Sequence, residues 1–422
     1  MIKDKNLVII GGGPAGLAAA KAAYDAGERD ILVLEREDRL GGILNQCIHN
    51  GFGLHTFKEE LTGPEYAARY EREVAKRGIE CKTGTTVLSI ADKVVACVSA
   101  EDGLVKYRAK AIILACGCRE RPRGAINIAG CRASGVFSAG TAQKLINIDG
   151  LMPGKEVVIL GSGDIGLIMA RRMTFQGAKV KAVVELMPYS SGLNRNIVQC
   201  LQDFDIPLYF SHTVVAINGK KRVTSVVVAA VDEKLQPIPG TEWEIPCDTL
   251  LLSVGLLPEN EIAKTAEVKL SPITSGAVVD DTLMTSREGV FACGNVLHVH
   301  DLVDFVSEES EKAGACAAKY IAEGAGASEY VDIGADGGVR YAVPQRVRRG
   351  ADGALGFKMR VGKVAKNVKI TLFCDGKEVA AKRKQIVTPG EMETLNLNAA
   401  QADVLRRAKE AVIRLKIGRA HV

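Results

Sequence analysis

One structural device, an apolar strand that runs into a glycine-rich turn and then a helix, occurs twice in this chain. In the first copy the strand at residues 7–10 precedes a G-x-G-x-x-G turn at residues 11–16, and the next strand ends in Glu35. In the second copy the turn occupies residues 161–166, and the next strand ends in Glu185 at the same spacing. A lone glycine motif is a weak signal, but two copies in this context are typical of dinucleotide-binding units. The sequence therefore predicts two bound dinucleotides.

Each position of the turn has a physical role. The first glycine makes the tight turn, the second lets the backbone approach a pyrophosphate, and the third lets the helix pack close to the strand. The helix N-terminus offers N–H groups and the positive end of its dipole to the phosphates, and the acid accepts hydrogen bonds from ribose hydroxyls. The residues predicted for the first dinucleotide are Gly11, Gly13, Pro14, Ala15, Gly16 and Glu35, and those for the second are Gly161, Gly163, Asp164, Ile165, Gly166 and Glu185.

The second acid also discriminates between nicotinamide cofactors. The carboxylate of Glu185 would repel a 2′-phosphate and accept a hydrogen bond from a free 2′-hydroxyl. Residues 186–189, which follow it, include no arginine that would hold such a phosphate. The sequence therefore favours NAD over NADP.

Length and cysteine usage exclude several classes of protein. A chain of 422 residues suits two or three domains. The eleven cysteines include no CxxC pair and no Cys/His cluster with zinc spacing, so we expect no metal site and a reducing, cytoplasmic location. No run of about 18 apolar residues is present, so we expect no transmembrane segment. The strand at residues 7–10 begins too early to leave room for a signal peptide.

The charge is unevenly distributed along the chain. Residues 331–416 hold 18 Lys and Arg against 9 Asp and Glu. No aromatic ladder or groove-reading motif accompanies this basic segment, so we expect no nucleic-acid partner. A docking face for an acidic protein and a plain solvated surface both remain open. A D-G turn at residues 375–376 predicts a hairpin in a small β-rich domain, which we expect to contact another subunit or to cover the face of a bound cofactor.

Three further apolar strands end in glycine turns, at Gly117, at Gly255 and at Gly294-Asn295. Together with the two repeated units they predict an α/β fold with two Rossmann-like dinucleotide-binding domains and a small β-rich C-terminal domain. Residues 417–422 correspond to the translation of a common sequencing-adapter stretch and are expected to be an artefact. The predicted boundaries are 1–122 with 284–325 for one dinucleotide domain, 123–283 for the other, inserted in it, and 331–416 for the β-rich domain.

These motifs resemble the two-dinucleotide-domain flavoprotein superfamily that includes glutathione reductase, thioredoxin reductase and NADH oxidase. The resemblance covers roughly residues 5–325. It implies that the first glycine turn binds FAD and the second binds NAD(H). The late strand of this superfamily usually ends in Gly-Asp, whereas this chain has Gly294-Asn295, which brings no charge to the ribityl region. The resemblance adds Gly42, Gly117, Gly294 and Asn295 to the predicted FAD site and Gly255 to the predicted NAD site.

Two segments carry a narrower resemblance. Residues 41–53 and 299–304 are similar to the flavoprotein subunit found beside anaerobic-type glycerol-3-phosphate dehydrogenases, and more distantly to the alpha subunits of amine, opine and sarcosine oxidases. This likeness implies electron transfer between NAD(H) and a partner dehydrogenase subunit. The sequence also leaves open the formation of a homo-oligomer.

The redox-active cysteine pairs of the superfamily are missing. Leu44 and His49 stand where disulfide reductases of the glutathione type carry two cysteines, and residues 131–134 have only one thiol where thioredoxin reductases carry CxxC. Cys47 lies close to where NADH oxidases and peroxidases place a single flavin-side cysteine. It could cycle through sulfenic acid with help from His49, or it could be a small buried residue. We interpret Cys116 and Cys118 as packing residues, because C-x-C is too tight for an unstrained disulfide.

Polar residues also follow the Gly294-Asn295 turn. His298, His300, Asp301 and Asp304 could supply a general acid, contact a second subunit, or cap the helix that follows. His49 and His55 are each more readily explained as structural or surface histidines.

Three functions remain open from the sequence. The leading hypothesis is an FAD-dependent oxidoreductase that exchanges a hydride with NAD(H) and passes electrons to or from a partner dehydrogenase subunit, of the glycerol-3-phosphate or amine dehydrogenase type. The second is a self-sufficient NADH oxidase or peroxidase that uses Cys47 and His49. The third is a scaffold or sensor that binds dinucleotides without turnover.

Overall fold

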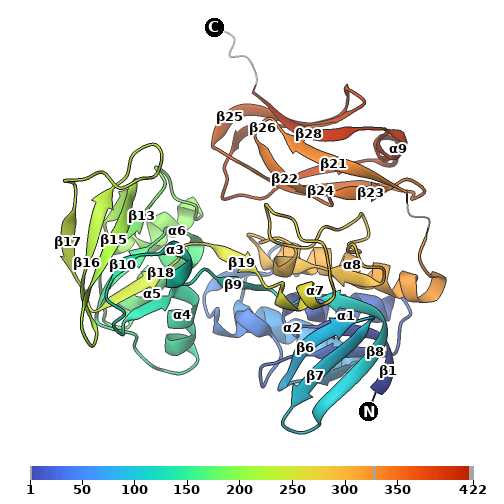
Figure 1. The fold of residues 1–422 in the computed structure, drawn as a ribbon, viewed down its shortest axis with the longest axis horizontal. Coiled ribbons are helices and arrows are strands. Elements are labelled where there is room, and N and C mark those ends of the chain that lie inside the picture. The colour runs from blue at the N-terminus through green and yellow to red at the C-terminus, as the bar shows by residue number, and fades with distance from the viewer. Residues whose placement is uncertain (1, 327–328, 418–422) are drawn as a thin grey trace. The chain divides into compact units, whose positions relative to one another are not determined.

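The computed structural model describes residues 2–326 and 329–417, and Figure 1 shows its ribbon. The chain forms two compact units: the first contains residues up to Cys118 and from Pro258 onward, and the second contains Arg119–Leu257. Two short strands, β9 (Cys118–Glu120) and β19 (Leu256–Pro258), pair where the chain passes between the units. Of the segment expected to be an artefact, residues 418–422 lie outside the described residues, and Ile417 is the last residue of the final strand.

The first unit is built on a sheet with the strand order β5-β2-β1-β8-β7-β6, in which β20 also pairs with β8. β1, β2, β5, β20 and the end of β8 run parallel, and residues 7–10 and 111–114 are almost wholly buried, as continuous apolar runs in a parallel sheet should be. The strands are β1 (Ile2–Ile10), β2 (Ile31–Leu34), β5 (Glu80–Lys82), β6 (Thr85–Ala91), β7 (Val94–Ser99), β8 (Gly103–Leu114) and β20 (Val290–Ala292), with a small hairpin of β3 (Asn50–Phe52) and β4 (Leu61–Thr62) beside them.

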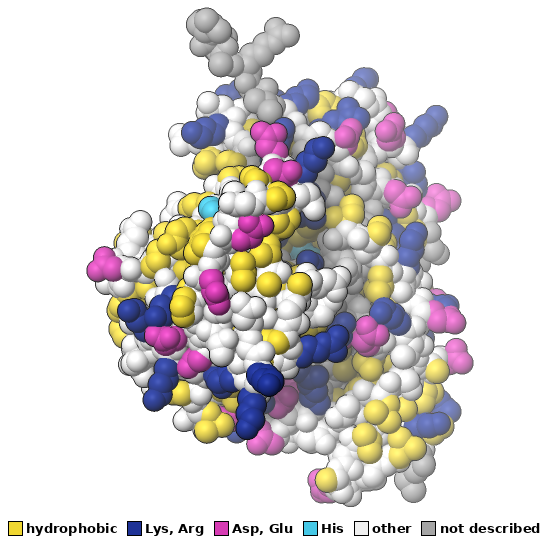
Figure 2. Space-filling view, turned by 60° about the vertical axis from the view of Figure 1, so that its left-hand side comes forward, with side chains coloured by type: hydrophobic (Ala, Val, Ile, Leu, Met, Phe, Trp, Pro, Cys, Tyr) yellow, Lys and Arg dark blue, Asp and Glu magenta, His cyan; other side chains and the backbone are white. Residues whose placement is uncertain are grey.

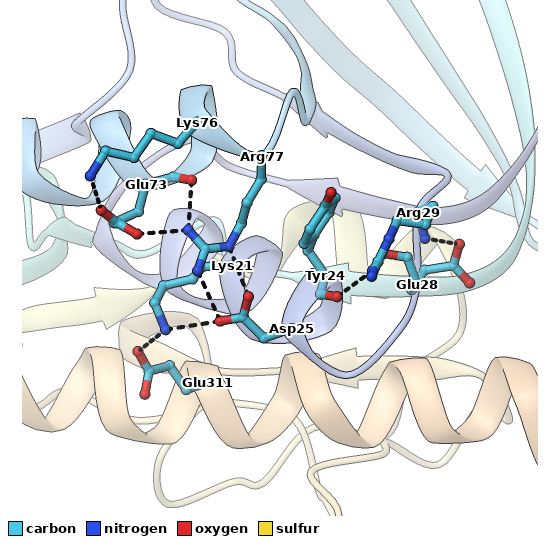
Figure 3. Close-up of polar contacts among 9 residues, drawn as sticks. All are labelled: Lys21, Tyr24, Asp25, Glu28, Arg29, Glu73, Lys76, Arg77 and Glu311. Carbon is cyan, nitrogen blue, oxygen red and sulfur yellow. Dashed lines mark hydrogen bonds and ion pairs between the residues drawn. The ribbon is translucent and has the colours of Figure 1, made fainter.

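Helices α1 (Pro14–Asp25), α2 (Gly63–Lys76) and α8 (Val303–Glu323) belong to this unit. α1 and α8 approach closely, since a Cβ added at Gly314 would lie only 2.1 Å from the carbonyl oxygen of Ala19. Ion pairs link the three helices at their surface (Figure 3). Lys21 of α1 lies 3.3 Å from Asp25 and 3.7 Å from Glu311 of α8, and Arg77, which follows α2, lies 2.8 Å from Asp25. Surface pairs of this kind are each worth little.

The domain boundary predicted at residue 283 differs from the structure, because the second unit ends at Leu257. Residues 258–283 contain the short helix α7 (Glu261–Thr265) and otherwise follow an irregular path. They nevertheless bury Ala263, Val268 and Val279 in the core of the first unit. The hydroxyl of Thr265 also accepts a hydrogen bond from the backbone N–H of Ile90 in β6, at 2.9 Å. Tertiary burial thus assigns this segment to the first unit.

The second unit contains a parallel sheet in the order β11-β18-β12-β13-β14 and a second sheet in the order β10-β15-β16-β17. Along β12, Val157 and Ile159 face one core and Val158 and Leu160 face another, so both faces of the parallel sheet are covered. The strands are β10 (Ala129–Gly130), β11 (Val136–Ser138), β12 (Glu156–Leu160), β13 (Lys179–Glu185), β14 (Leu208–Phe210), β15 (His212–Gly219), β16 (Val223–Ala230), β17 (Trp243–Pro246) and β18 (Thr249–Leu252); the helices are α3 (Arg123–Ile126), α4 (Ala139–Asn147), α5 (Asp164–Phe175) and α6 (Asn194–Cys200).

The C-terminal residues form two sheets around a separate apolar core that includes Phe357 and Ile370. One sheet has the order β23-β21-β28-β25-β26 and the other β22-β24-β27. The elements, drawn in orange to red in Figure 1, are β21 (Tyr330–Asp336), β22 (Val339–Val343), β23 (Arg346–Arg348), β24 (Leu355–Val361), β25 (Ala365–Cys374), β26 (Lys377–Val387), β27 (Glu393–Leu397), α9 (Ala399–Arg407) and β28 (Ala411–Ile417).

Two surface properties complete the description. None of the helices in the described part of the chain combines the length and the apolar character that a membrane span requires. On the face drawn in Figure 2, basic and acidic side chains are interspersed and do not form one large patch of a single sign.

Candidate functional site

The first glycine turn has two crowded positions and one open position. Gly11 has a φ of +112°, and a Cβ there would lie 2.4 Å from the carbonyl oxygen of Ala115. A Cβ at Gly16 would lie 1.8 Å from the carbonyl oxygen of Gly11. At Gly13, by contrast, a Cβ would meet only the Cα of Gly42, at 3.8 Å. The backbone is therefore bare where a pyrophosphate has to approach, and the turn fits a dinucleotide.

The acid of the first unit is held in place before any ribose binds. Glu35 is buried, and its Oε2 accepts a hydrogen bond of 2.7 Å from the backbone N–H of Gly12. Its Oε1 accepts one of 2.9 Å from the backbone N–H of Glu37. Each carboxylate oxygen has a second lone pair, so the oriented side chain can still accept hydrogen bonds from hydroxyls.

Other predicted FAD residues gather around this turn. A Cβ at Gly42 would lie 3.0 Å from the Cα of Gly13, and one at Gly294 would lie 2.9 Å from the Cβ of Ala15. The Asn295 side chain is engaged by the protein: its Oδ1 accepts a hydrogen bond of 3.0 Å from the N–H of His300, and its Nδ2 contacts the sulfur of Cys118 at 3.6 Å. This internal role could not be recognised in the sequence. Gly117, three residues beyond the end of β8, has a φ of +71°, and Pro14 opens helix α1.

The second turn repeats this arrangement. A Cβ at Gly161 would lie 2.1 Å from the carbonyl oxygen of Ser253, and one at Gly166 would lie 2.7 Å from that of Gly161. A Cβ at Gly163 would meet only serine hydroxyls, the nearer being that of Ser253 at 3.5 Å. Gly163 is thus the open position, as Gly13 is in the first turn. Ser253, which sequence reasoning missed, also accepts a hydrogen bond of 3.1 Å from the N–H of Gly166.

Glu185 is oriented by a serine that the motif itself carries. Its Oε2 accepts hydrogen bonds from the backbone N–H of Ser162 at 2.8 Å and from the hydroxyl of Ser162 at 2.6 Å. Its Oε1 accepts one of 2.9 Å from the N–H of Met187 and keeps a free lone pair. Asp164, in the first turn of α5, accepts hydrogen bonds from Leu193 and Asn196. Ile165 is partly buried against the apolar core of the second unit that contains Val157 and Ile159. Gly255 has a φ of +102°.

The two predicted catalytic side chains lie in the segment after η1 (Gly42–Gln46). The Cys47 thiol donates a hydrogen bond of 3.3 Å to the carbonyl oxygen of Ile43. Although the residue as a whole is only partly buried, burial raises the pKa of the Cys47 thiol to about 12. At neutral pH this sulfur is a thiol rather than the thiolate that redox cycling needs. The Nδ1 of His49 lies 3.0 Å from the carbonyl oxygen of Asn50, and its ring packs against Phe52.

Burial likewise raises the pKa of the Cys116 thiol to about 12, and none of the described cysteines is joined in a disulfide. The sulfur of Cys116 contacts the carbonyl oxygen of Ile10 at 3.7 Å. This contact agrees with the packing role expected for Cys116.

Of the three interpretations left open for the polar residues after Gly294-Asn295, the structure contradicts the one in which they cap helix α8. The residue at the helix N-cap is Leu302, which makes no side-chain capping bond. Asp304 instead accepts hydrogen bonds from three backbone N–H groups of the segment 53–56, and Asp301 pairs with Arg360 of β24. Their partners are more than 50 residues away in the sequence, so no local pattern could identify them.

His298 and His300 meet at the buried carboxylate of Glu309 in α8. These are side-chain types that bind metals, and no sequence signal indicated the cluster, because Glu309 lies in an ordinary helical pattern. The cation that faces this carboxylate is the ammonium group of Lys358, 3.5 Å from its Oε2.

Comparison with known proteins agrees with this geometry. The family model described as pyridine nucleotide-disulphide oxidoreductase matches residues 5–319. The chain belongs to this family. Its members are enzymes that use FAD and NAD(P)H, so this protein is an FAD- and NAD(P)-dependent oxidoreductase, and a bound flavin supplies its hydride chemistry.

Individual relatives are distant. The chain is 26% identical to the thioredoxin reductase of Treponema pallidum (strain Nichols) over 301 residues, which cover 70% of this chain and 90% of that protein. It is 24% identical to one subunit of the opine oxidase of Agrobacterium tumefaciens (strain Ach5) over 313 residues, or 69% of this chain and 61% of that protein. The crystal structure of thioredoxin reductase from T. acidophilum covers 75% of this chain and 98% of its own, with a TM-score of 0.61 and 24% identity. The fold is therefore the expected α/β arrangement of two dinucleotide-binding domains, with an added β-rich C-terminal region.

Proposed function

We propose that this enzyme works in the cytoplasm, exchanges a hydride between NAD(H) and bound FAD, and passes electrons to or from a partner dehydrogenase subunit. The observation that carries the proposal is the state of the cysteines. The superfamily's redox pairs are absent from the sequence, and Cys47 is held as a thiol by burial. Without a dithiol of its own, the enzyme needs another protein to complete the electron path.

The nature of the partner rests on resemblance. Residues 41–53 and 299–304 are similar to the flavoprotein subunit beside anaerobic-type glycerol-3-phosphate dehydrogenases, and one relative is itself named as a subunit of an opine oxidase. We therefore propose a partner that dehydrogenates a small polyol phosphate or amine. The proposed nicotinamide cofactor is NAD, because the anionic, oriented carboxylate of Glu185 opposes a 2′-phosphate.

The two open glycines allow each cofactor site to be tested alone. Gly13→Ala places a methyl group in the proposed FAD cradle without a steric clash with the protein, and Gly163→Ala does the same in the proposed NAD cradle. Gly124→Ala is the matched control, because a Cβ there would meet nothing within 4 Å. The assay is the visible flavin spectrum during anaerobic titration with NADH.

We expect the wild-type protein and Gly124→Ala to bind FAD and to lose the oxidised flavin band as NADH is added. Gly13→Ala should be purified without flavin, and Gly163→Ala should stay yellow in the presence of NADH. The assignment of the two cradles fails if Gly163→Ala bleaches as readily as the wild type. The proposed reductase half-reaction fails if the flavin of the wild-type protein does not bleach.

The alternative of a self-sufficient oxidase or peroxidase is tested separately at Cys47. If electrons leave through a partner, Cys47→Ser should change neither flavin bleaching by NADH nor the slow reoxidation of the reduced protein in air. Rapid turnover of NADH with oxygen or peroxide that disappears in Cys47→Ser would overturn the partner proposal. Loss of this rapid NADH turnover in Cys47→Ser is expected only if Cys47 is the redox group.

A further inference from the structure

The buried carboxylate of Glu309 in α8 contacts the Gly294 turn, the histidines that follow it and Lys358 of β24. Its Oε1 accepts a hydrogen bond of 2.9 Å from the backbone N–H of Gly294. Its Oε2 lies 2.9 Å from the Nε2 of His298 and 3.3 Å from the Nε2 of His300. The Nζ of Lys358 approaches the same oxygen at 3.5 Å and donates to the carbonyl oxygen of Phe305 at 3.2 Å.

This geometry sets which ring nitrogen of each imidazole carries the hydrogen in the neutral form. Each Nε2 faces a carboxylate oxygen, so each carries a hydrogen at Nε2, and a neutral ring then has its lone pair at Nδ1. The Nδ1 atoms of His298 and His300 are buried and have no hydrogen-bond partner among the described residues. Burial lowers the pKa of His298 to about 4. Burial would raise the pKa of Glu309, but His300, His298 and Lys358 hold it well below the usual value.

The Glu309 carboxylate is therefore faced by the side chain of Lys358 and by two imidazoles, of which His298 is neutral at pH 7. A metal fits this arrangement poorly. A histidine that binds a metal through Nε2 donates its Nδ1–H to an acceptor, and neither Nδ1 has one among the described residues. Lys358 also already places a positive charge at the carboxylate. The two bare Nδ1 lone pairs are instead available as proton acceptors.

A single residue, Gly294, connects this cluster to the proposed FAD cradle. Gly294, whose N–H binds Glu309, packs so closely on the first glycine turn that an added Cβ would lie 2.9 Å from the Cβ of Ala15. Two-electron reduction of FAD by a hydride leaves the flavin with one more negative charge. In a buried, low-dielectric setting, such a charge favours protonation of nearby bases.

We propose that the His298–His300 pair takes up one proton when FAD bound in the first glycine cradle is reduced. The hydride comes from NADH, which leaves as NAD⁺. The proton comes from water and binds the Nδ1 lone pair of one imidazole, and it returns to water when the flavin gives up its electrons. The inference rests on the FAD site of the proposed function, but not on the identity of the partner.

Other charged groups around the pair are already matched, so they do not compete for this proton. Asp301 is paired with Arg360, and its second oxygen accepts the N–H of Met392 at 2.6 Å. Tyr341 of β22 packs edge-on against His298 with ring centres 6.1 Å apart, and burial raises the pKa of its hydroxyl. The N–H of His300 is bound by Asn295.

The direct test is NMR of the FAD-loaded protein labelled with ¹⁵N only in histidine, of which the chain has six. Nitrogen shifts distinguish the two neutral tautomers from the imidazolium form. His298→Gln and His300→Gln identify the two signals, since glutamine can still donate to Glu309. Reduction with dithionite makes the test independent of NADH.

In the oxidised protein at pH 7 we expect both signals to be those of the neutral Nε2–H tautomer. After anaerobic reduction, one of them should become imidazolium. The proposal is overturned if both stay neutral on reduction, or if either is already imidazolium before it. A preparation that binds no FAD would instead refute the proposed function.

A second measurement gives a thermodynamic readout. Each additional proton taken up changes the reduction equilibrium tenfold per pH unit, which is about 30 mV for a two-electron couple. The flavin midpoint potential of the wild type should therefore fall about 30 mV per pH unit more steeply between pH 6 and 8 than that of the double variant His298→Gln/His300→Gln. His212→Gln, in the second unit, is the matched control and should keep the wild-type slope. Equal slopes in the wild type and the double variant would overturn the proposal.

Discussion

Replacing Asp304 by asparagine should loosen the segment 53–56, which follows the candidate residues Cys47 and His49 in the chain. Asp304 is 3% exposed and accepts hydrogen bonds from the backbone N–H groups of Gly53 at 3.2 Å, His55 at 3.2 Å and Thr56 at 2.8 Å. Asparagine has the same shape, but its NH₂ group would point at one of these donors, and its single oxygen is uncharged. Hydrogen bonds to a charged group are worth roughly 1.5–3 kcal/mol and neutral ones about 1 kcal/mol.

Losing one such bond and weakening the others should cost about 3 kcal/mol. The favourable interaction of the carboxylate with the N-terminal end of α8 adds up to about 1 kcal/mol to the loss. For a unit of this size, each kcal/mol lowers the melting temperature by roughly 2 °C, so we expect a decrease of about 6–8 °C. The assay is thermal unfolding followed by FAD release, which reports on the first unit.

The chain has an internal control for this assay. Its single tryptophan, Trp243, lies in the second unit, so its fluorescence transition should be unchanged in Asp304→Asn. Glu308→Gln alters an exposed carboxylate on the same helix and should melt like the wild type. The reasoning is refuted if Asp304→Asn melts within about 1 °C of the wild type, or if Glu308→Gln is equally unstable.

Three further outcomes are expected. Gly16→Ala should abolish flavin retention and destabilise the first unit, because its Cβ would lie 1.8 Å from the carbonyl oxygen of Gly11; a stable yellow variant would contradict this. The folded-state pKa of His298, about 4, lies below its unfolded value near 6.5, so stability should fall by up to about 3 kcal/mol as the pH drops through this window. Urea unfolding at pH 7 and pH 4.5 should show a smaller loss in His298→Gln. Lys358→Met should leave the Glu309 carboxylate without its cation and lower the melting temperature, at a cost of roughly 3 kcal/mol or more; unchanged melting would show that the pair contributes nothing.

Local rules explain why the glycine turns could be predicted. Gly11 and Gly161 adopt positive φ, and Gly16 and Gly166 sit against backbone atoms, so these conformations demand glycine in any sequence that builds the turn. The same logic separates glycines required by the fold from Gly13 and Gly163, which remain free for a ligand. The sequence reveals the motif, but only the structure distinguishes these two kinds of position.

The domain boundary and the polar cluster lie outside such rules. Residues 258–283 have little regular structure, and only the burial of side chains such as Ala263 and Val268 shows which unit they join. His298 and His300 had three open interpretations, because their partner Glu309 looks like any helical glutamate. The ammonium group that faces the Glu309 carboxylate belongs to Lys358 in β24, a strand of the C-terminal region.

By itself, the sequence determined the chain's two glycine turns, its α/β class and the absence of the superfamily's cysteine pairs. These follow from residue types at short, fixed spacings, where backbone sterics leave few alternatives. Only the tertiary structure decided that burial keeps Cys47 a thiol and that Asp304 accepts hydrogen bonds from the distant segment 53–56. It also decided that the Glu309 carboxylate contacts two histidines and a lysine. Burial and long-range hydrogen bonds fix these properties, and both depend on atoms brought together from remote parts of the chain.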